Sequence, residues 1–189
     1  EIVAITQFAS KHNLWILSDE IYSEYVYGVK HLRFPLDYPR LIEINSYSKS
    51  HGITGWRLAY AIGPERAVQA MAKVQQHTLV CASSLAQAAV LDGRDFEHQQ
   101  VRIEYQARRD LICQGLESHY QFIRPGGAFY LFAKAPGANA TEFCERAAEK
   151  KLLIVPGHVF SEQDTHFRLC FASPRATLER AVQILQSLA

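Results

Sequence analysis

Short continuous apolar runs that end in polar residues constrain the fold of this chain more than any other feature. Three such runs occupy residues 14–17, 41–44 and 57–62. Runs of this length and character are typical of strands buried on both faces, as in parallel α/β sheets. Helical spacing of apolar residues separates or flanks them, at residues 1–12, 65–78 and 82–91. We therefore predict an α/β fold with a mostly parallel sheet in this half of the chain.

The second half of the chain has a different pattern. A long amphipathic helix is predicted from Arg94 to Gly115, and it is followed by short strands and helices of a smaller α+β part. Asn139 with Glu142 three residues later has the spacing of a capping box at a helix start. The expected division is residues 1–92, a connecting helix over residues 93–118, and a small C-terminal domain over residues 119–189.

Charge and composition exclude several classes of function. Twenty basic residues against nineteen acidic ones leave a net charge of +1, which gives no support for nucleic acid or an anionic membrane as partner. No apolar run reaches the length of about 18 residues that a transmembrane helix needs. The four cysteines and eight histidines are dispersed without metal-ligand spacing, so we expect no metal site and buried thiols in a reducing cytoplasm.

Polar residues gather where the predicted strands end. The clusters are Asp19-Glu20-Ile21-Tyr22, Ser46-Tyr47-Ser48-Lys49 and Gly52-Ile53-Thr54-Gly55-Trp56-Arg57. Ligand sites of α/β folds lie at the carboxyl ends of parallel strands. Each cluster alone is weak evidence, because such residues are more often caps or solvated loop residues. Their combination and order carry the information.

In that order, D-E-x-Y, S-x-S-K and an arginine eight residues after the lysine resemble the class I and II aminotransferases of the fold type I pyridoxal-phosphate enzymes. Three later segments support the resemblance, at residues 124–130, 155–160 and 167–171. The resemblance covers essentially the whole chain. It implies part of the large cofactor-binding domain followed by a small C-terminal domain, with pyridoxal 5'-phosphate as cofactor.

The resemblance also implies roles for three residues around the cofactor ring. Lys49 would attach the cofactor and, once displaced by an amino acid, move a proton between substrate and cofactor. Asp19 would pair with the pyridine nitrogen and keep it protonated, so that the ring accepts electrons. Tyr22 would donate a hydrogen bond to the 3'-oxygen of the cofactor.

Four further residues are implied as anion ligands. Arg57 and Ser46 would hold the cofactor phosphate, and Ser48 would add to them. Arg168 matches the arginine that grips the substrate α-carboxylate, where a planar guanidinium fixes the orientation of the substrate. Two histidines are interpreted more simply, His51 as a solvated loop residue and His158 as part of a turn bordering the pocket.

The expected reaction moves an amino group from an α-amino acid to a 2-oxo acid, in a cytoplasmic homodimer. A β-lyase or cyclising synthase would use the same residues, and a non-catalytic effector-binding domain of this fold is the alternative from another class. An aspartate-type or aromatic-tolerant preference fits the small-domain motif by resemblance. The family's N-terminal half, with its glycine-rich phosphate turn, is absent from the sequence, so we expect a fragment that is poorly folded or inactive in isolation.

Overall fold

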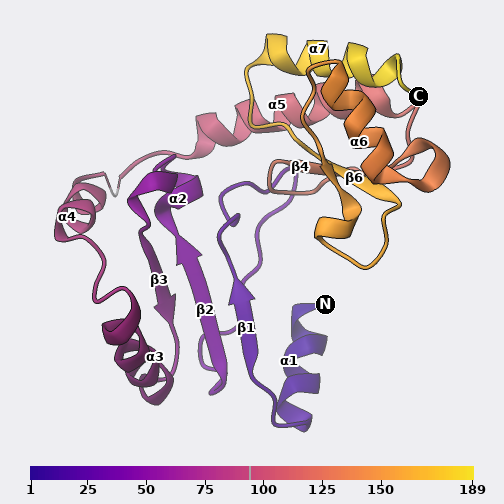
Figure 1. Cartoon of the computed structure of the whole chain (residues 1–189). Helices are drawn as coiled ribbons and strands as arrows, with labels where there is room; N and C mark the ends of the chain where they lie inside the picture. The colour runs from indigo at the N-terminus through magenta and orange to yellow at the C-terminus, as the bar shows by residue number, and fades with distance from the viewer. Residues whose placement is uncertain (94) are drawn as a thin grey trace. The chain divides into compact units, whose positions relative to one another are not determined.

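The structure is a computed structural model that describes residues 1–93 and 95–189. The chain forms two compact units, Glu1–His98 and Gln99–Ala189 (Figure 1). Arg94, where the long helix was predicted to begin, lies outside the described residues. That helix, α5, spans Gln99–Leu116 and belongs to the second unit.

The first unit is built on a three-stranded sheet of order β1-β2-β3 (Figure 1). The strands are β1 (Ile16–Asp19), β2 (Leu41–Ser46) and β3 (Ala59–Ile62). β1 and β2 are parallel, as predicted, whereas β3 runs antiparallel to β2 and corrects the expectation of a third parallel strand. The chain between β2 and β3 contains only two single-turn helices, which favours a direct return over the long crossover that a parallel strand requires.

The two faces of β1 differ in burial. Ile16 and Ser18 are buried while Leu17 and Asp19 are exposed, so the prediction of burial on both faces is wrong for β1. The helix α1 (Ile2–Lys11) and the chain around Tyr38 supply the cover, because Ala9 and Tyr38 cluster with residues of β1 and β2. On the open face Leu17 keeps 67% of its surface accessible. Asp19 shares that open face because side chains alternate along a strand.

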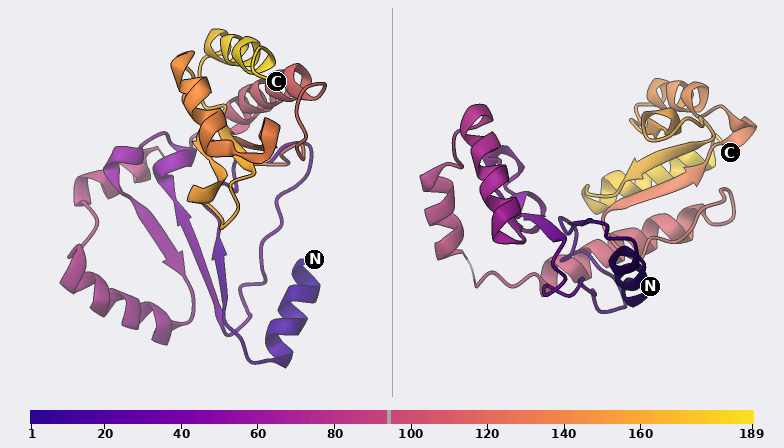
Figure 2. Two further views of the ribbon diagram at one scale, coloured as in Figure 1. Left: turned by 45° about the vertical axis from the view of Figure 1, so that its right-hand side comes forward. Right: turned by 90° about the horizontal axis from the view of Figure 1, so that it is seen from below.

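Two helices follow β3 and lie on the side of the sheet where β3 forms the edge (Figure 2). They are α3 (Glu65–Thr78), whose bounds match the predicted range, and α4 (Ser84–Asp92), which Ser83 caps by accepting a hydrogen bond from the Ala86 amide at 3.4 Å. No residue of α3 is buried in the described structure. A groove of about 950 Å³ lies between α3 and the strand end that carries Ala59 and Tyr60.

The second unit is an antiparallel sheet of order β4-β6-β5 with three helices. The remaining elements are β4 (Tyr130–Lys134), β5 (Val155–Pro156), β6 (His166–Cys170), α6 (Ala140–Glu149) and α7 (Arg175–Gln186). Its core contains most of the largest fully buried side chains of the described structure, among them Phe143, Phe167, Phe171 and Leu131. The predicted cap of α6 is confirmed, since Asn139 Oδ1 accepts a hydrogen bond from the Glu142 amide at 3.1 Å.

α5 and α7 pack side by side through a glycine. A Cβ atom added at Gly115 would lie 2.5 Å from a methyl carbon of Val182 on α7. Valine is stiff because its branch is at Cβ, so it cannot turn away easily. Close approach of the two helices therefore depends on the absence of a side chain at residue 115.

We expect Gly115→Ala to lower the free energy of unfolding by about 1–2 kcal/mol, because overpacking outweighs the gain in helix propensity. The double variant Gly115→Ala/Val182→Ala should recover part of this loss, since it removes the clashing methyl groups. Urea denaturation of the single and double variants measures both effects. A Gly115→Ala variant more stable than wild type would contradict the packing argument.

Candidate active site

The first predicted cluster lies at the carboxyl end of β1, where alternation separates its two acids. Glu20 is buried, accepts a hydrogen bond from the Ser18 hydroxyl at 2.6 Å and contacts His31. Asp19 is exposed, and its Oδ1 accepts the amide hydrogen bond of Ile21 at 3.2 Å. The carboxylate available to a ligand is therefore that of Asp19. Tyr22 follows in a tight turn and is half-buried.

The second cluster forms a single helical turn, α2 (Tyr47–Ser50), directly after β2. Ser46 caps this turn by accepting a hydrogen bond from the Ser48 amide at 3.0 Å. The Ser46 hydroxyl donates its one proton to the Leu58 carbonyl at 2.9 Å. In this conformation it has no proton left for a phosphate, so the predicted role of Ser46 requires the hydroxyl to rotate. Lys49 is half-buried on the same turn, and Ser48 is buried.

Tyr25 joins the first two clusters, a role that the sequence analysis missed. Its ring is 4% exposed, and its hydroxyl donates a hydrogen bond to the Lys49 carbonyl at 2.8 Å. A second link is the hydrogen bond that the side-chain amide of Asn45 donates to the Ser23 hydroxyl at 3.3 Å. No local pattern predicts these contacts, because they join residues more than twenty positions apart.

Arg57 is brought to the same edge by the antiparallel direction of β3. Ser46 pairs with Ala59, so the residue two before Ala59 lies beside the turn that carries Lys49. Arg57 adopts φ 53°, a left-handed conformation that costs a non-glycine residue about 1–2 kcal/mol. Its side chain is exposed and donates a hydrogen bond to the Thr54 carbonyl at 3.0 Å. Strain of this kind gathers at functional sites, where the backbone aims a side chain.

Arg168 lies in the second unit, on β6, with its guanidinium close to two aromatic rings. The Cζ atom is 4.4 Å from the ring centroids of both Tyr130 and Phe160. Its Nε is buried and has no hydrogen-bond partner among residues 1–93 and 95–189. A buried donor of this kind is unfavourable by about 1–3 kcal/mol unless it is satisfied, so the geometry fits an anionic ligand such as a carboxylate.

Both histidines that the sequence analysis interpreted have protein partners, and His51 is less solvated than expected. His51 is half-buried among rings, with its ring centroid 5.2 Å from those of Tyr47 and His98 and 5.7 Å from that of Phe96. Burial, followed by repulsion from His98, lowers the pKa of His51.

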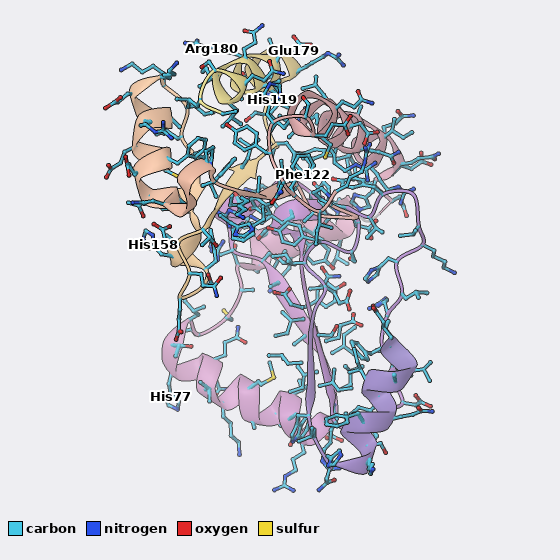
Figure 3. The ribbon with its side chains drawn as sticks, turned by 90° about the vertical axis from the view of Figure 1, so that its right-hand side faces the viewer. His77, His119, Phe122, His158, Glu179 and Arg180 are labelled. Atoms are coloured by element: carbon cyan, nitrogen blue, oxygen red, sulfur yellow. The ribbon has the colours of Figure 1, made fainter. Side chains whose placement is uncertain are left out.

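His158 lies beside the start of α6 (Figure 3), where its Nδ1 is 3.0 Å from the Thr141 hydroxyl oxygen. That hydroxyl also donates to Asp164 at 2.6 Å, and this hydrogen bond is the largest contribution that lowers the pKa of Asp164.

Comparison with known proteins identifies the family of the chain. Residues 1–185 match the family described as aminotransferase class I and II. The aspartate aminotransferase of Thermotoga maritima is 34% identical over 189 residues, which cover 97% of this chain and 49% of that protein. Aromatic-amino-acid aminotransferase 2 of Thermococcus litoralis is 34% identical over 202 residues, covering 100% of this chain and 52% of that protein.

Solved structures give the same result. The crystal structure of the Thermotoga maritima aspartate aminotransferase has a TM-score of 0.90 at 33% identity, over 98% of this chain and 50% of that one. An aromatic aminotransferase from Pyrococcus horikoshii has a TM-score of 0.92 at 26% identity, over 100% of this chain and 56% of that one. The chain thus spans about half the length of these relatives.

The chain belongs to the class I and II aminotransferase family, a family of transferases that use pyridoxal 5'-phosphate. The predicted family and fold class are therefore confirmed. Among residues 1–93 and 95–189, none of the helices combines the length and apolar character needed to cross a bilayer.

We expect Tyr25→Phe to lower the free energy of unfolding by about 0.5–1.5 kcal/mol, because it removes the side-chain hydrogen bond to the Lys49 carbonyl, which keeps the Gly52 amide as a donor at 3.2 Å. Hydrogen exchange should also speed up in peptides that cover residues 47–51. Tyr60→Phe is the matched control, since the Tyr60 side chain is exposed. Equal effects of the two substitutions would argue against the link between Tyr25 and Lys49.

The lowered pKa of His51 has a consequence for stability. In the unfolded chain His51 has its ordinary pKa of 6.5, whereas in the folded protein its pKa is lower. As the pH falls, the unfolded chain therefore binds a proton at His51 first, and the free energy of unfolding decreases. We expect His51→Phe to flatten the fall in the free energy of unfolding between about pH 7 and pH 5. His77→Phe, at an exposed position on α3 (Figure 3), should leave the slope unchanged. An unaltered slope in His51→Phe would contradict this account.

Proposed function

We propose that the protein carrying this sequence is a pyridoxal-phosphate-dependent aminotransferase that moves an amino group from an α-amino acid to a 2-oxo acid. The observation that carries the proposal is the convergence of Asp19, Lys49 and Arg57 at one edge of the first sheet. A carboxylate, an amine and a guanidinium there complement the ring nitrogen, the aldehyde and the phosphate of the cofactor.

Bound pyridoxal phosphate would supply an electron sink for the bond that breaks at the substrate Cα. Asp19, exposed on the open face, would hold the proton of the ring nitrogen. Tyr22 would donate its hydroxyl proton to the 3'-oxygen. The Lys49 amine would take the proton from the substrate Cα and return it on the cofactor side.

The phosphate would be held by Arg57, with Ser46 and Ser48 as further ligands. Arg57 is the strongest member of this set, because its strained backbone presents an exposed cation at the site edge. Ser48 would act through its hydroxyl, and Ser46 would do so after releasing the Leu58 carbonyl. In the second unit, Arg168 would bind the substrate α-carboxylate through the edge of its guanidinium.

The remaining predictions enter the proposal with it. The first unit would be part of the large cofactor-binding domain, and the second would be the small domain. We propose a cytoplasmic homodimer with an amino acid and a 2-oxo acid as its substrates. The two relatives described above are named for aspartate and for aromatic amino acids, so these two classes of amino donor are the first to test.

We expect the protein that carries this sequence to develop a near-visible absorbance band when pyridoxal phosphate is added. Borohydride reduction followed by peptide mapping should then place the cofactor on Lys49, because reduction makes the attachment permanent. Lys49→Ala should abolish the trapped peptide and lower turnover by at least about a thousandfold. Lys73→Ala removes an exposed lysine of α3 and should change neither result.

The half-reaction with an amino acid alone separates the proposed activity from its rivals. An aminotransferase converts the bound cofactor to pyridoxamine phosphate and releases a 2-oxo acid, whereas a β-lyase releases pyruvate and ammonia. Ammonia release would replace the proposed reaction by a lyase reaction. A trapped cofactor without either product would favour an effector-binding domain.

A further inference from the structure

We propose that Phe160 and Tyr130 are positioning residues that clamp the Arg168 guanidinium, so that only its edge can meet a substrate carboxylate. The inference rests on the proposed function, since that function assigns the carboxylate to Arg168. It adds two residues to the site and a reason for the orientation of the arginine.

The clamp is defined by two ring contacts. The Arg168 Cζ atom is 4.4 Å from the ring centroid of Tyr130 and 4.4 Å from that of Phe160. At this distance the ring quadrupole attracts a cation placed over its face. Contacts with rings involve the faces of the guanidinium, whereas its five N–H donors lie in its plane. The donors at the edge then remain for a ligand, and Arg168 is held in one orientation before the ligand arrives.

The unpartnered Nε indicates which edge of the guanidinium would bind the carboxylate. This atom is buried and has no hydrogen-bond partner among the described residues. Arginine binds a carboxylate in a planar, two-point arrangement, and Nε with a neighbouring Nη is one edge that permits it. A carboxylate that reached this edge in the guanidinium plane would satisfy the orphaned donor.

The fold fixes Phe160 by a tight turn. The single-turn helix η3 (Gly157–Val159) ends at Phe160, whose amide donates to the Gly157 carbonyl at 2.8 Å. A Cβ atom at Gly157 would lie 2.6 Å from the backbone oxygen of His166, so only glycine allows the turn to approach β6 so closely. Just before the turn, Val155 pairs with Arg168 itself. The pairing of this segment with β6 therefore places the Phe160 ring close to Arg168.

Tyr130 is fixed from the other side, by the sheet. It is the first residue of β4 and pairs with Cys170, two residues from Arg168 on the neighbouring strand. Its ring lies 4.9 Å from that of Phe129, which is 7% exposed. Phe160, in contrast, is 46% exposed, so substitution there perturbs the clamp with little effect on the core.

The experiment compares Phe160→Leu, which removes the ring, with Phe160→Tyr, which keeps it. Two readouts are needed in the protein that carries this sequence: steady-state KM and kcat for the amino acid, and the Kd of 3-phenylpropionate from calorimetry. The probe has a carboxylate and no amino group, so its binding does not depend on turnover. Phe122→Leu is the matched control in the same unit, and Arg168→Leu defines the loss of the whole contact.

We expect Phe160→Leu to raise KM and the Kd of the probe in parallel, by about 3- to 30-fold, with kcat within about threefold of wild type. Phe160→Tyr and Phe122→Leu should stay within about twofold in both constants. Tyr130→Phe should also stay near wild type, whereas Tyr130→Leu should resemble Phe160→Leu.

Several results would overturn the clamp. They are an unchanged Kd in Phe160→Leu, an equal change in Phe122→Leu, or a lower kcat at constant KM together with a lower Tm. Absence of probe binding to the wild type, or binding that Arg168→Leu does not weaken, would also overturn it. Binding that depends on Phe160 in a protein without transaminase turnover would support the clamp and reject the proposed reaction.

Discussion

The candidate active site depends first on the hydrogen-bond ladder that joins β2 to both its neighbours. Parallel pairing with β1 sets Asp19 opposite Ile44, and antiparallel pairing with β3 sets Ser46 opposite Ala59. The end of β1, the end of β2 and the start of β3 therefore lie at one edge. A slip of one residue in either ladder would turn side chains to the opposite face of the sheet. The polar clusters are useful only because both registers hold.

The two units differ in how much apolar surface they bury. The second unit has a continuous aromatic and aliphatic core, in which the buried Tyr120 ring donates its hydroxyl proton to the Leu185 carbonyl and burial raises the pKa of Tyr120 to about 12. The first unit has two small apolar clusters of three or four buried residues, and Leu17 of β1 stays accessible. The residues proposed to meet the cofactor belong to the unit with less buried apolar surface. Local contacts such as that of Tyr25 with Lys49 are correspondingly important there.

Buried polar groups differ in whether the protein itself satisfies their hydrogen bonds. The buried Glu43 carboxylate is paired with Arg33, and Ser46 uses both its donor and acceptor within the protein. The Nε of Arg168 is buried without such a partner, although its guanidinium is stabilised by two rings. An anion that accepts a hydrogen bond from a buried, unsatisfied donor removes the unfavourable free energy of that donor. This difference supports the proposed role of Arg168.

The sequence by itself determined the features that depend on neighbours along the chain. Helical spacing predicted α3 at its observed bounds, and the Asn139–Glu142 spacing predicted the start of α6. The identities and order of the motif residues also predicted the family, which the comparisons confirmed. Periodicity and capping can be read locally because they arise within a few residues.

Tertiary structure alone decided the direction of β3, the one-sided burial of β1 and the role of Tyr25. It also decided that the Ser46 hydroxyl donates to a backbone carbonyl and that two rings lie close to the Arg168 guanidinium. Most of these features join residues distant in sequence, and each depends on which surfaces meet after the chain has folded. No local propensity encodes them, because their free energy comes from burial and pairing that exist only in the folded protein.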